Sequence, residues 1–396
     1  MDTNIPHYNA VCLGSSPLLL LEAIHQRRCD ARTLVIEKDK VTGGAWRDLT
    51  IFGIPRVEVG PHFLTFDPIG YDYLSEDLGL NMQRVAPDPL YVINTAFGAW
   101  RVPYQFAALV SFITVPYYFL KHRAFRSSWT ELQHGYVSRI HHAFVSLHSW
   151  LFAERKPYLN YFRHGTPELM DKIMQMAEGE GVNFQFETQV KEVEKLKDGR
   201  LKLNLGGRFI TTDHLYMTCH QFIDSFKEGD VTVPMESAPV RYSSIHMLIR
   251  SSMESPVSFI HAKGDPYIFL FSDLTSFTKG VPAGHRLVVL RFTAAQDAWD
   301  EGKVHGLVQY LAEQGFVAPD ARLAQYEFSD YTQNLIAAGS QSLLQERMAP
   351  ALTVWDSTLL TSSIGRQVKR WREQTAAQTN FARVPEPLQM ASSPAH

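Results

Sequence analysis

The sequence predicts an α/β protein in which a doubly wound parallel-sheet domain is interleaved with a second, mixed α+β domain. Three features predict this fold: a strand, turn, helix and strand between residues 8 and 37, a paired-glycine loop at residues 43–44, and a strand-rich region that starts near residue 241. Two strands joined through a helix are the repeating unit of doubly wound sheets. The 396 residues, 45% of them hydrophobic, suffice for two domains with large cores.

The first of these features has the pattern of a dinucleotide-binding βαβ unit. Its expected elements are a strand at 8–13, a helix at 18–27 and a strand at 32–36. In such a unit the helix N-terminus holds a pyrophosphate and an acid about 20 residues later binds a ribose, a spacing that Gly14 and Glu37 match. Ser16 and Leu19 replace the second and third glycines of the G-x-G-x-x-G pattern. A turn that no longer binds a nucleotide therefore remains an alternative.

Four later segments resemble flavoproteins of the amine-oxidase and UDP-galactopyranose mutase-like group. Residues 37–46 resemble the acid and paired glycines of the glutathione-reductase-like superfamily, and residues 57–63 resemble a G-x-H segment that runs beside the flavin. Residues 161–170 are similar to a glycine-then-helix element, and residues 181–193 to the strand pair that returns to the dinucleotide domain. The resemblance implies a glutathione-reductase-like FAD-binding Rossmann domain interleaved with a mixed α+β substrate domain.

The resemblance also divides the chain into segments that alternate between the two domains. The expected segments are 1–66 (first part of the FAD-binding domain), 67–160 (mostly helical cap or substrate region), 161–225 (second part of the FAD-binding domain), 226–350 (substrate-domain sheet), 351–383 (C-terminal segment of the FAD-binding domain) and 384–396 (disordered tail). Within them we expect a hairpin at 90–102, a helix from Thr166 to Glu178 that Thr166 caps, and a helix from about 298 to 314.

The resemblance implies FAD as the cofactor and three groups of residues around it: the turn and acid, the glycine loops, and later strand and helix ends. The implied cofactor-binding residues are Gly14, Ser15, Ser16, Glu37, Lys38, Gly43, Gly44, Ala45, Trp46, Gly60, Pro61, His62, Val190, Thr218, Ser362, Ser363 and Ile364. The last three would present a helix N-terminus to the flavin, which stabilises negative charge there. An ordinary capped amphipathic helix is the alternative for this segment.

Catalytic candidates follow from the same resemblance, which places His62 and His164 close to the flavin ring. A neutral imidazole can donate a hydrogen bond to the flavin or move a proton near neutral pH, and Arg163 could orient an anionic substrate. The expected substrate-binding residues are Tyr267, Arg241 and Arg291. His62, His164 and Arg163 could instead only support their loops.

Three functional hypotheses share this architecture. The first is an FAD-dependent, amine-oxidase-like oxidoreductase that takes a hydride from a small molecule. The second is a mutase-like, non-redox use of the flavin on a sugar nucleotide, which needs arginines for the diphosphate. The third is a flavin fold that has lost its cofactor, which the incomplete glycine turn allows. The first is favoured because the mutase pattern is incomplete.

Composition excludes other classes of function. The net charge of −3, from 38 basic and 41 acidic residues, argues against nucleic-acid binding. We expect no metal site and no hydrolase, since the clustered histidines at 141, 142 and 148 lack i, i+4 spacing and no G-x-S-x-G is present. Three cysteines in apolar segments and an N-terminus without a signal pattern predict a cytoplasmic protein.

One apolar segment, residues 106–120, leaves two interpretations open. It is uncharged, but it is short for a membrane-spanning helix and Pro116 interrupts it. It could line a core or a substrate cavity, or it could make a weak monotopic membrane contact.

Overall fold

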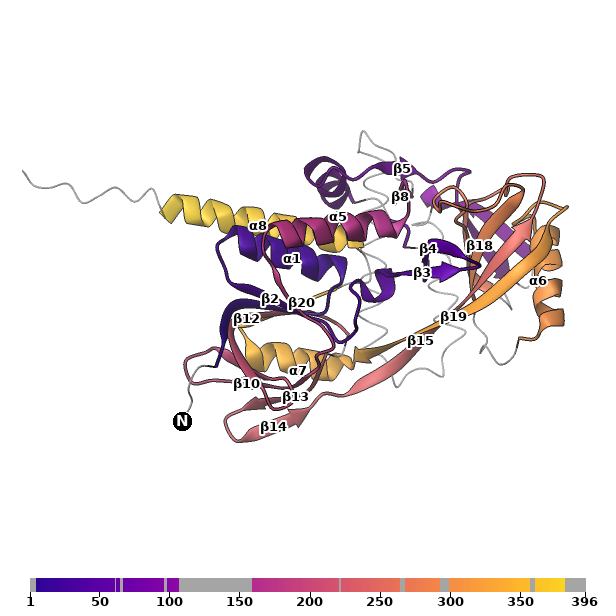
Figure 1. Cartoon of the computed structure of the whole chain (residues 1–396). Helices are drawn as coiled ribbons and strands as arrows, with labels where there is room; N and C mark the ends of the chain where they lie inside the picture. Colours follow the sequence, from indigo (N-terminus) through magenta and orange to yellow (C-terminus); the bar gives the residue numbers. More distant parts are fainter. Residues whose placement is uncertain are drawn as a thin grey trace, which may run out of the picture.

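Figure 1 shows the computed structural model of the chain, in which two sheets and their covering helices form two interleaved parts. The structure describes residues 5–60, 62–64, 67–95, 98–106, 159–220, 222–263, 268–292, 299–356 and 360–381. All structural statements below concern these residues.

The first sheet is parallel at its centre. Its central strands are β9 (Asn183–Gln185), β2 (Thr33–Ile36), β1 (His7–Leu13), β12 (Phe209–Thr218) and β20 (Leu352–Trp355). Every residue of β2 and the last four of β1 are buried, as expected for parallel strands covered on both faces. The antiparallel strands β10 (Val190–Lys195) and β11 (Leu201–Asn204) lead into β12, and β13 (Ile223–Glu228) and β14 (Val231–Pro234) extend the edge. This is the expected dinucleotide-binding architecture.

Helices cover both faces of this sheet (Figure 1). On one face lie α1 (Pro17–Arg28), α5 (Thr166–Gly179) and α8 (Leu360–Phe381); on the other lies α7 (Ala338–Met348). Because side chains alternate along a strand, Ala10 and Cys12 of β1 pack in the first core, and Val11 and Leu13 in the second. Residues 17–24 of α1 are buried all round because they lie between the sheet and the other two helices, and the last turn of the helix is polar.

A buried ion pair joins α1 to α8. The Glu22 side chain is fully buried and accepts a 2.5 Å hydrogen bond from Arg370 and a 3.0 Å bond from Gln367. The indole of Trp371 donates to the same carboxylate, and its ring stacks on His25 with centroids 4.5 Å apart. Removal of one partner would leave a buried charge unpaired, so this cluster specifies where α8 docks.

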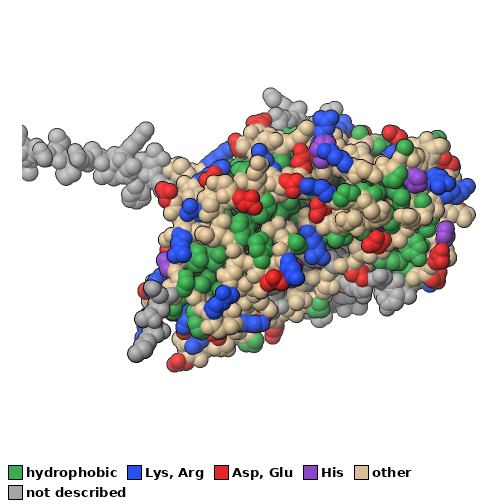
Figure 2. All heavy atoms as spheres, viewed as in Figure 1, with side chains coloured by type: hydrophobic (Ala, Val, Ile, Leu, Met, Phe, Trp, Pro, Cys, Tyr) green, Lys and Arg blue, Asp and Glu red, His purple; other side chains and the backbone are tan. Residues whose placement is uncertain are grey.

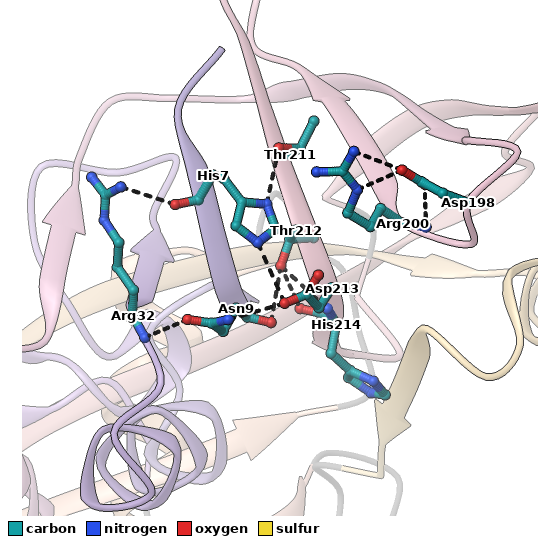
Figure 3. A network of polar contacts seen from close by, with 9 residues as sticks. All are labelled: His7, Asn9, Arg32, Asp198, Arg200, Thr211, Thr212, Asp213 and His214. Carbon is teal, nitrogen blue, oxygen red and sulfur yellow. Dashed lines mark hydrogen bonds and ion pairs between the residues drawn. The ribbon is translucent and has the colours of Figure 1, made fainter. Parts of the chain in front are cut away.

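A polar network holds the amino-terminal ends of β1 and β12 in register (Figure 3). His7 Nδ1 lies 3.1 Å from Thr211 Oγ1, and the Asn9 side-chain amide donates to Asp213 at 3.0 Å. The Arg32 N–H in turn donates to Asn9 Oδ1 at 2.9 Å. The network lies at the opposite end of β1 from Gly14, so it fixes strand register and takes no part in the site.

The second sheet is mostly antiparallel. Its order is β19 (Arg322–Ile336), β15 (Ser237–Arg250), β18 (His285–Phe292), β17 (Ile268–Asp273), β16 (Phe259–Lys263), β6 (Leu90–Thr95) and β7 (Gly98–Pro103). The helix α6 (Glu301–Glu313) packs Val304, Leu307 and Leu311 into its core. The long β15–β19 ladder runs from this sheet to the first one, where the Ile336 N–H donates to the Cys219 carbonyl at 3.0 Å. The two sheets therefore meet at the carboxyl ends of the first sheet's parallel strands.

Shorter elements complete the described fold. They are the 3-10 turn η1 (Gly44–Trp46), the hairpin β3 (Asp48–Ile51) and β4 (Ile54–Glu58), α2 (Pro68–Asp72), the π-helical turn η2 (Tyr73–Asp77), β5 (Met82–Arg84), the 3-10 turn η3 (Tyr104–Phe106) and β8 (Asn160–Phe162). α2 packs against α8 so closely that a Cβ at Gly70 would collide with the Thr361 backbone. β5 and β8 pair antiparallel, and β8 leads into α5.

Most sequence expectations for the elements are confirmed, with specific corrections. The hairpin at 90–102 and the helix from Thr166 are present, but Gly165 is the N-cap of α5, so Thr166 is already helical and does not cap it. β12 is a single strand that pairs with β1 between Thr211 and Met217.

The segment boundaries differ at three places. The boundary expected at 226 falls within β13, which belongs to the first sheet together with β14. β6 and β7, expected in a mostly helical cap, extend the second sheet. α7, expected within the substrate sheet, packs on the first sheet through Leu344 and Met348.

The surface charge and the helices of the described residues can be compared with the expectations for nucleic-acid and membrane partners. Figure 2 shows acidic and basic side chains interspersed on the face in view, in line with the small net charge. None of the helices in the described part of the chain is long and apolar enough to cross a membrane. Of the apolar segment 106–120, only Phe106 lies within the described residues, and the tail 384–396 lies outside them.

Candidate functional site

A cavity lies where the carboxyl ends of β1 and β2 face the second sheet. Its volume is about 310 Å³, at the lower end of the range for small-molecule sites. The first sheet contributes residues 14–16, 37–39, 43–46 and 218–220 to its lining, and the second contributes Ser244, Arg291 and residues 334–335. Leu19, Val59, His62 and Phe222 complete it. Ligands of open α/β sheets bind at this end of the strands.

The turn between β1 and α1 presents a helix N-terminus to the cavity. Gly14 has a φ of +100°, and a Cβ there would lie 2.7 Å from the Phe222 ring, so only glycine fits. Ser16 is the N-cap of α1 but makes no side-chain cap, and its buried hydroxyl has no hydrogen-bond partner among the described residues. The first turn of α1 carries no acid. The free N–H groups and the orphaned hydroxyl fit an anion such as a phosphate.

Glu37 is buried beside this turn, only 4% exposed. Its Oε2 accepts from the Ser15 N–H at 2.9 Å and from the Ser15 hydroxyl at 2.5 Å, and its Oε1 accepts from the Asp39 N–H at 3.1 Å. The Ser15 hydroxyl also accepts from the Gly43 N–H at 3.0 Å. Ser15 thus joins the turn, the acid and the glycine loop. Of the roughly four acceptor positions of a carboxylate, about one stays available for a ligand hydroxyl.

The paired-glycine loop packs tightly on α5. Gly43 and Gly44 have φ values of +98° and +54°, and a Cβ at Gly43 would lie 3.3 Å from Met170 of α5. The loop ends in η1, which carries Trp46 into the cavity. The Trp46 indole stacks on the His62 ring with centroids 4.1 Å apart and planes inclined by 26°.

His62 is held as a neutral imidazole. Burial, and after it the positive charge of Arg291, lower its pKa to about 3, while the Gly60 backbone opposes the shift. Its Nδ1 is buried and has no hydrogen-bond partner among the described residues. The ring therefore offers a neutral hydrogen-bonding atom at neutral pH, oriented by Trp46.

Arg291 reaches the cavity from β18. It pairs with Ser244 of β15 across the ladder, and both residues line the cavity. Its guanidinium lies over Gly60, where any Cβ would collide with it. Gly60 therefore leaves the space that the guanidinium occupies, and a side chain at this position would make Arg291 shift.

A buried acid next to the site escaped sequence reasoning. Glu58 is 3% exposed, and its Oε1 accepts from the Thr166 N–H at 3.0 Å at the start of α5. Burial raises its pKa to about 7, although the Tyr161 hydroxyl and the N–H groups of Thr166 and His62 oppose the rise. The signal was an acid between Val57 and Val59 in an apolar strand end.

The structure brings most of the expected cofactor-binding residues together. Those that line the cavity are Gly14, Ser15, Ser16, Glu37, Lys38, Gly43, Gly44, Ala45, Trp46, His62 and Thr218. Gly60 lies just beneath Arg291, and Pro61 lies outside the described residues.

Two expected contributions to the cofactor site lie elsewhere. Val190 is buried in the core at the start of β10. α8 begins at Leu360, so Ser362, Ser363 and Ile364 lie within its first turns and none lines the cavity. The Ser363 hydroxyl donates to the Asp356 carbonyl, and Ile364 packs in the core.

The expected catalytic pair Arg163 and His164 also lies outside the cavity lining. Both are exposed in the turn before α5. The residues before them, Tyr161 and Phe162 of β8, are buried, and the chain then turns outward. Their backbone N–H groups bond to Asn81 and Glu168. Arg241 lies in β15 opposite Thr332, and Tyr267 lies outside the described residues.

Comparison with known proteins identifies the fold. No family model matches the chain, and no curated protein matches it by sequence. Among solved structures, cyclohexylamine oxidase from Brevibacterium oxydans has a TM-score of 0.61 at 12% identity, over 94% of this chain and 100% of that one. Putrescine oxidase bound to putrescine has a TM-score of 0.58 at 12% identity, over 95% and 99%. A protein named as protoporphyrinogen oxidase from Exiguobacterium has 0.57 at 13%, over 94% and 100%. The chain has the amine-oxidase-like fold that the resemblance implied.

Proposed function

We propose that this protein is an FAD-dependent oxidoreductase that acts on a small molecule by hydride transfer to the flavin. One observation carries the proposal: a single cavity joins the α1 N-terminus, Glu37 and the paired-glycine loop to side chains of the second sheet. The similarity of nearly the whole chain to oxidases supports the same class.

The residues of the cavity fit FAD. The α1 N-terminus and the orphaned Ser16 hydroxyl would hold the pyrophosphate, and the remaining acceptor capacity of Glu37 would take a ribose hydroxyl. Gly43 and Gly44 would let the backbone approach the cofactor closely. When bound, FAD would supply an acceptor for a hydride from the substrate.

The chain's own contribution to chemistry would come from the second-sheet side. His62 has a pKa too low for efficient proton transfer at neutral pH, so hydrogen bonding through Nδ1 is the role that its environment favours. Trp46 fixes the ring plane by stacking. Together with Val59 and Leu335 these side chains would exclude water from the reacting atoms.

Loss of the cofactor is a second candidate, and the Ser15–Glu37 contacts favour it. Glu37 already receives two hydrogen bonds from Ser15, and Phe222 packs against Gly14. The mutase-like alternative needs several arginines for a diphosphate and has less support, because the described cavity lining includes one arginine, Arg291.

Titration of the cofactor-free protein with FAD tests the proposal. We expect saturable binding that Glu37→Ala weakens by about 1 to 3 kcal/mol, because the substitution removes the acceptor for the ribose hydroxyl. Glu178→Ala, at an exposed position on α5, is the matched control and should leave the affinity unchanged. The absence of saturable FAD binding to the folded protein would favour the cofactor-free candidate.

A further inference from the structure

Glu58 is the last residue of β4 and begins a loop that reaches the cofactor cavity. Val59 and His62 of this loop line the cavity, whereas Glu58 is not among the described residues that line it. The Glu58 carbonyl accepts a 2.9 Å hydrogen bond from Nε2 of His246, a buried residue of β15. The second sheet therefore fixes the point at which the loop begins.

The Glu58 side chain reaches the other end of the same loop. Its Oε1 accepts the Thr166 N–H at 3.0 Å, and the backbone N–H of His62 also donates toward the carboxyl. A Cβ at Gly165 would lie 2.6 Å from Oε1, so this glycine leaves the space that the carboxyl occupies. Glu58 thus connects both ends of the loop to the start of α5.

The titratable groups that surround Glu58 are neutral at pH 7. Burial raises the pKa of Tyr161, on β8, well above 10, and it lowers the pKa of His246 to about 4. Burial, and after it the charge of Arg291 on β18, lower the pKa of His62 to about 3. Ionisation of Glu58 would therefore place a buried charge among neutral groups, which is costly.

Three buried polar atoms at this carboxyl have no hydrogen-bond partner in the described part of the chain: Glu58 Oε2, the Tyr161 hydroxyl and the Thr166 hydroxyl. A carboxylate accepts hydrogen bonds more strongly than a neutral acid, so ionisation would draw both hydroxyls and the His62 N–H toward it. A movement of this N–H also moves the His62 ring, which stacks on Trp46 with centroids 4.1 Å apart.

We propose that Glu58 is a positioning residue for His62: while it is protonated it holds the ring against Trp46, and its ionisation moves the ring. This inference rests on the proposed function and names what regulates the same site. The imidazole would supply a neutral hydrogen-bonding atom to the cavity, so the direction of that atom would depend on a proton held outside the cavity lining.

Fluorine NMR of the protein labelled with 5-fluorotryptophan tests the proposal. The chain has seven tryptophans, and Trp46→Phe identifies the signal of Trp46. In the wild type we expect this signal to shift with a midpoint near pH 7, a transition that His62, with a pKa of about 3, cannot produce. Glu58→Gln resembles the protonated acid at every pH, so it should hold the signal at its low-pH position from pH 5 to pH 8.

Tyr161→Phe keeps the proposal testable if Glu58→Gln does not fold. It removes a hydroxyl that favours the ionised carboxyl, so the midpoint should move to a higher pH. His220→Gln, which removes the other histidine of the described cavity lining, is the control and should keep the wild-type transition. A wild-type signal that does not shift, a transition that survives in Glu58→Gln, or a Tyr161→Phe midpoint that does not rise would overturn the proposal.

The outcome for the cofactor is separate. Flavin content is measured first by absorption, and a protein without flavin counts against the proposed function. The Trp46 signal tests the role of Glu58 in either case, because the contacts that connect Glu58, His62 and Trp46 lie within the protein itself.

Discussion

The hydroxyl of Ser15 donates a 2.5 Å hydrogen bond to Oε2 of Glu37, and the same hydroxyl accepts the N–H of Gly43 at 3.0 Å. A side chain in the nucleotide-binding turn thus connects the acid after β2 to the paired-glycine loop. All three groups are buried. Ser15 therefore orders the site before any ligand arrives, which is a role distinct from contact with a cofactor.

Ser15→Ala should destabilise the cofactor-free protein by about 1 to 3 kcal/mol, because it leaves the buried Gly43 N–H without its acceptor and removes a donor from Glu37. Ser16→Ala is the matched control, since the Ser16 hydroxyl has no partner among the described residues. Urea denaturation of both variants measures the difference. Equal losses of stability would show that the Ser15 bridge does not stabilise the fold.

Ser16 should matter for the cofactor instead. A bulky Ser16→Leu at the α1 N-cap should block the pyrophosphate and give protein without flavin, whereas Ser16→Gly should retain FAD, weakened only by the loss of the hydroxyl's hydrogen bond, about 0.5 to 1.5 kcal/mol. Flavin content after purification, read by absorption, checks this. The same flavin content in both variants would place the phosphates elsewhere.

Glu58 should make stability depend on pH. Its pKa is raised from 4.5 to about 7 in the folded protein, so its contribution is fully present below pH 4.5 and is lost as the pH rises through 7. Glu58→Gln stays neutral, and its stability relative to the wild type should therefore rise between pH 5 and pH 8, by up to roughly 3 kcal/mol. Urea denaturation at both pH values measures this, and a constant difference would contradict it.

His62 should remain neutral well below its ordinary pKa. Because burial lowers that pKa to about 3, its ring nitrogens should show the signals of a neutral imidazole from pH 7 down to pH 5 in long-range ¹H–¹⁵N spectra. The spectrum of His62→Gln identifies which signals belong to it. A protonated pattern at pH 6 would restore His62 as a candidate for proton transfer.

The dinucleotide-binding unit could be predicted from sequence because local signals agree there. Apolar strands end at Gly14 and at Glu37, and Pro17 begins the helix between them. The exposed positions of Arg163 and His164 could not be predicted, because they depend on how residues far away in the sequence bury the preceding strand β8. Whether residues 362–364 reach the cofactor site depends on where α8 begins. The docking of α8 on α1 and α2 decides that position.

The second sheet shows the same limit. β19 was missed because polar residues occupy most of its length, and its strand conformation follows from pairing with β15 over 14 residue pairs. Sequence patterns did not distinguish Arg291 from Arg241 as a substrate arginine, and only the ladder that pairs Arg291 with Ser244 places it at the cavity. The burial of Glu58 likewise follows from the packing of α5 against β4, which no local pattern encodes.

The visible absorption spectrum of the purified protein tests the central claim most directly. We expect flavin bands, and we expect the cofactor released on denaturation to be FAD, because the α1 N-terminus, Glu37 and the paired glycines line one cavity. A folded protein that shows no flavin bands, even after incubation with excess FAD and removal of the unbound cofactor, would contradict the account.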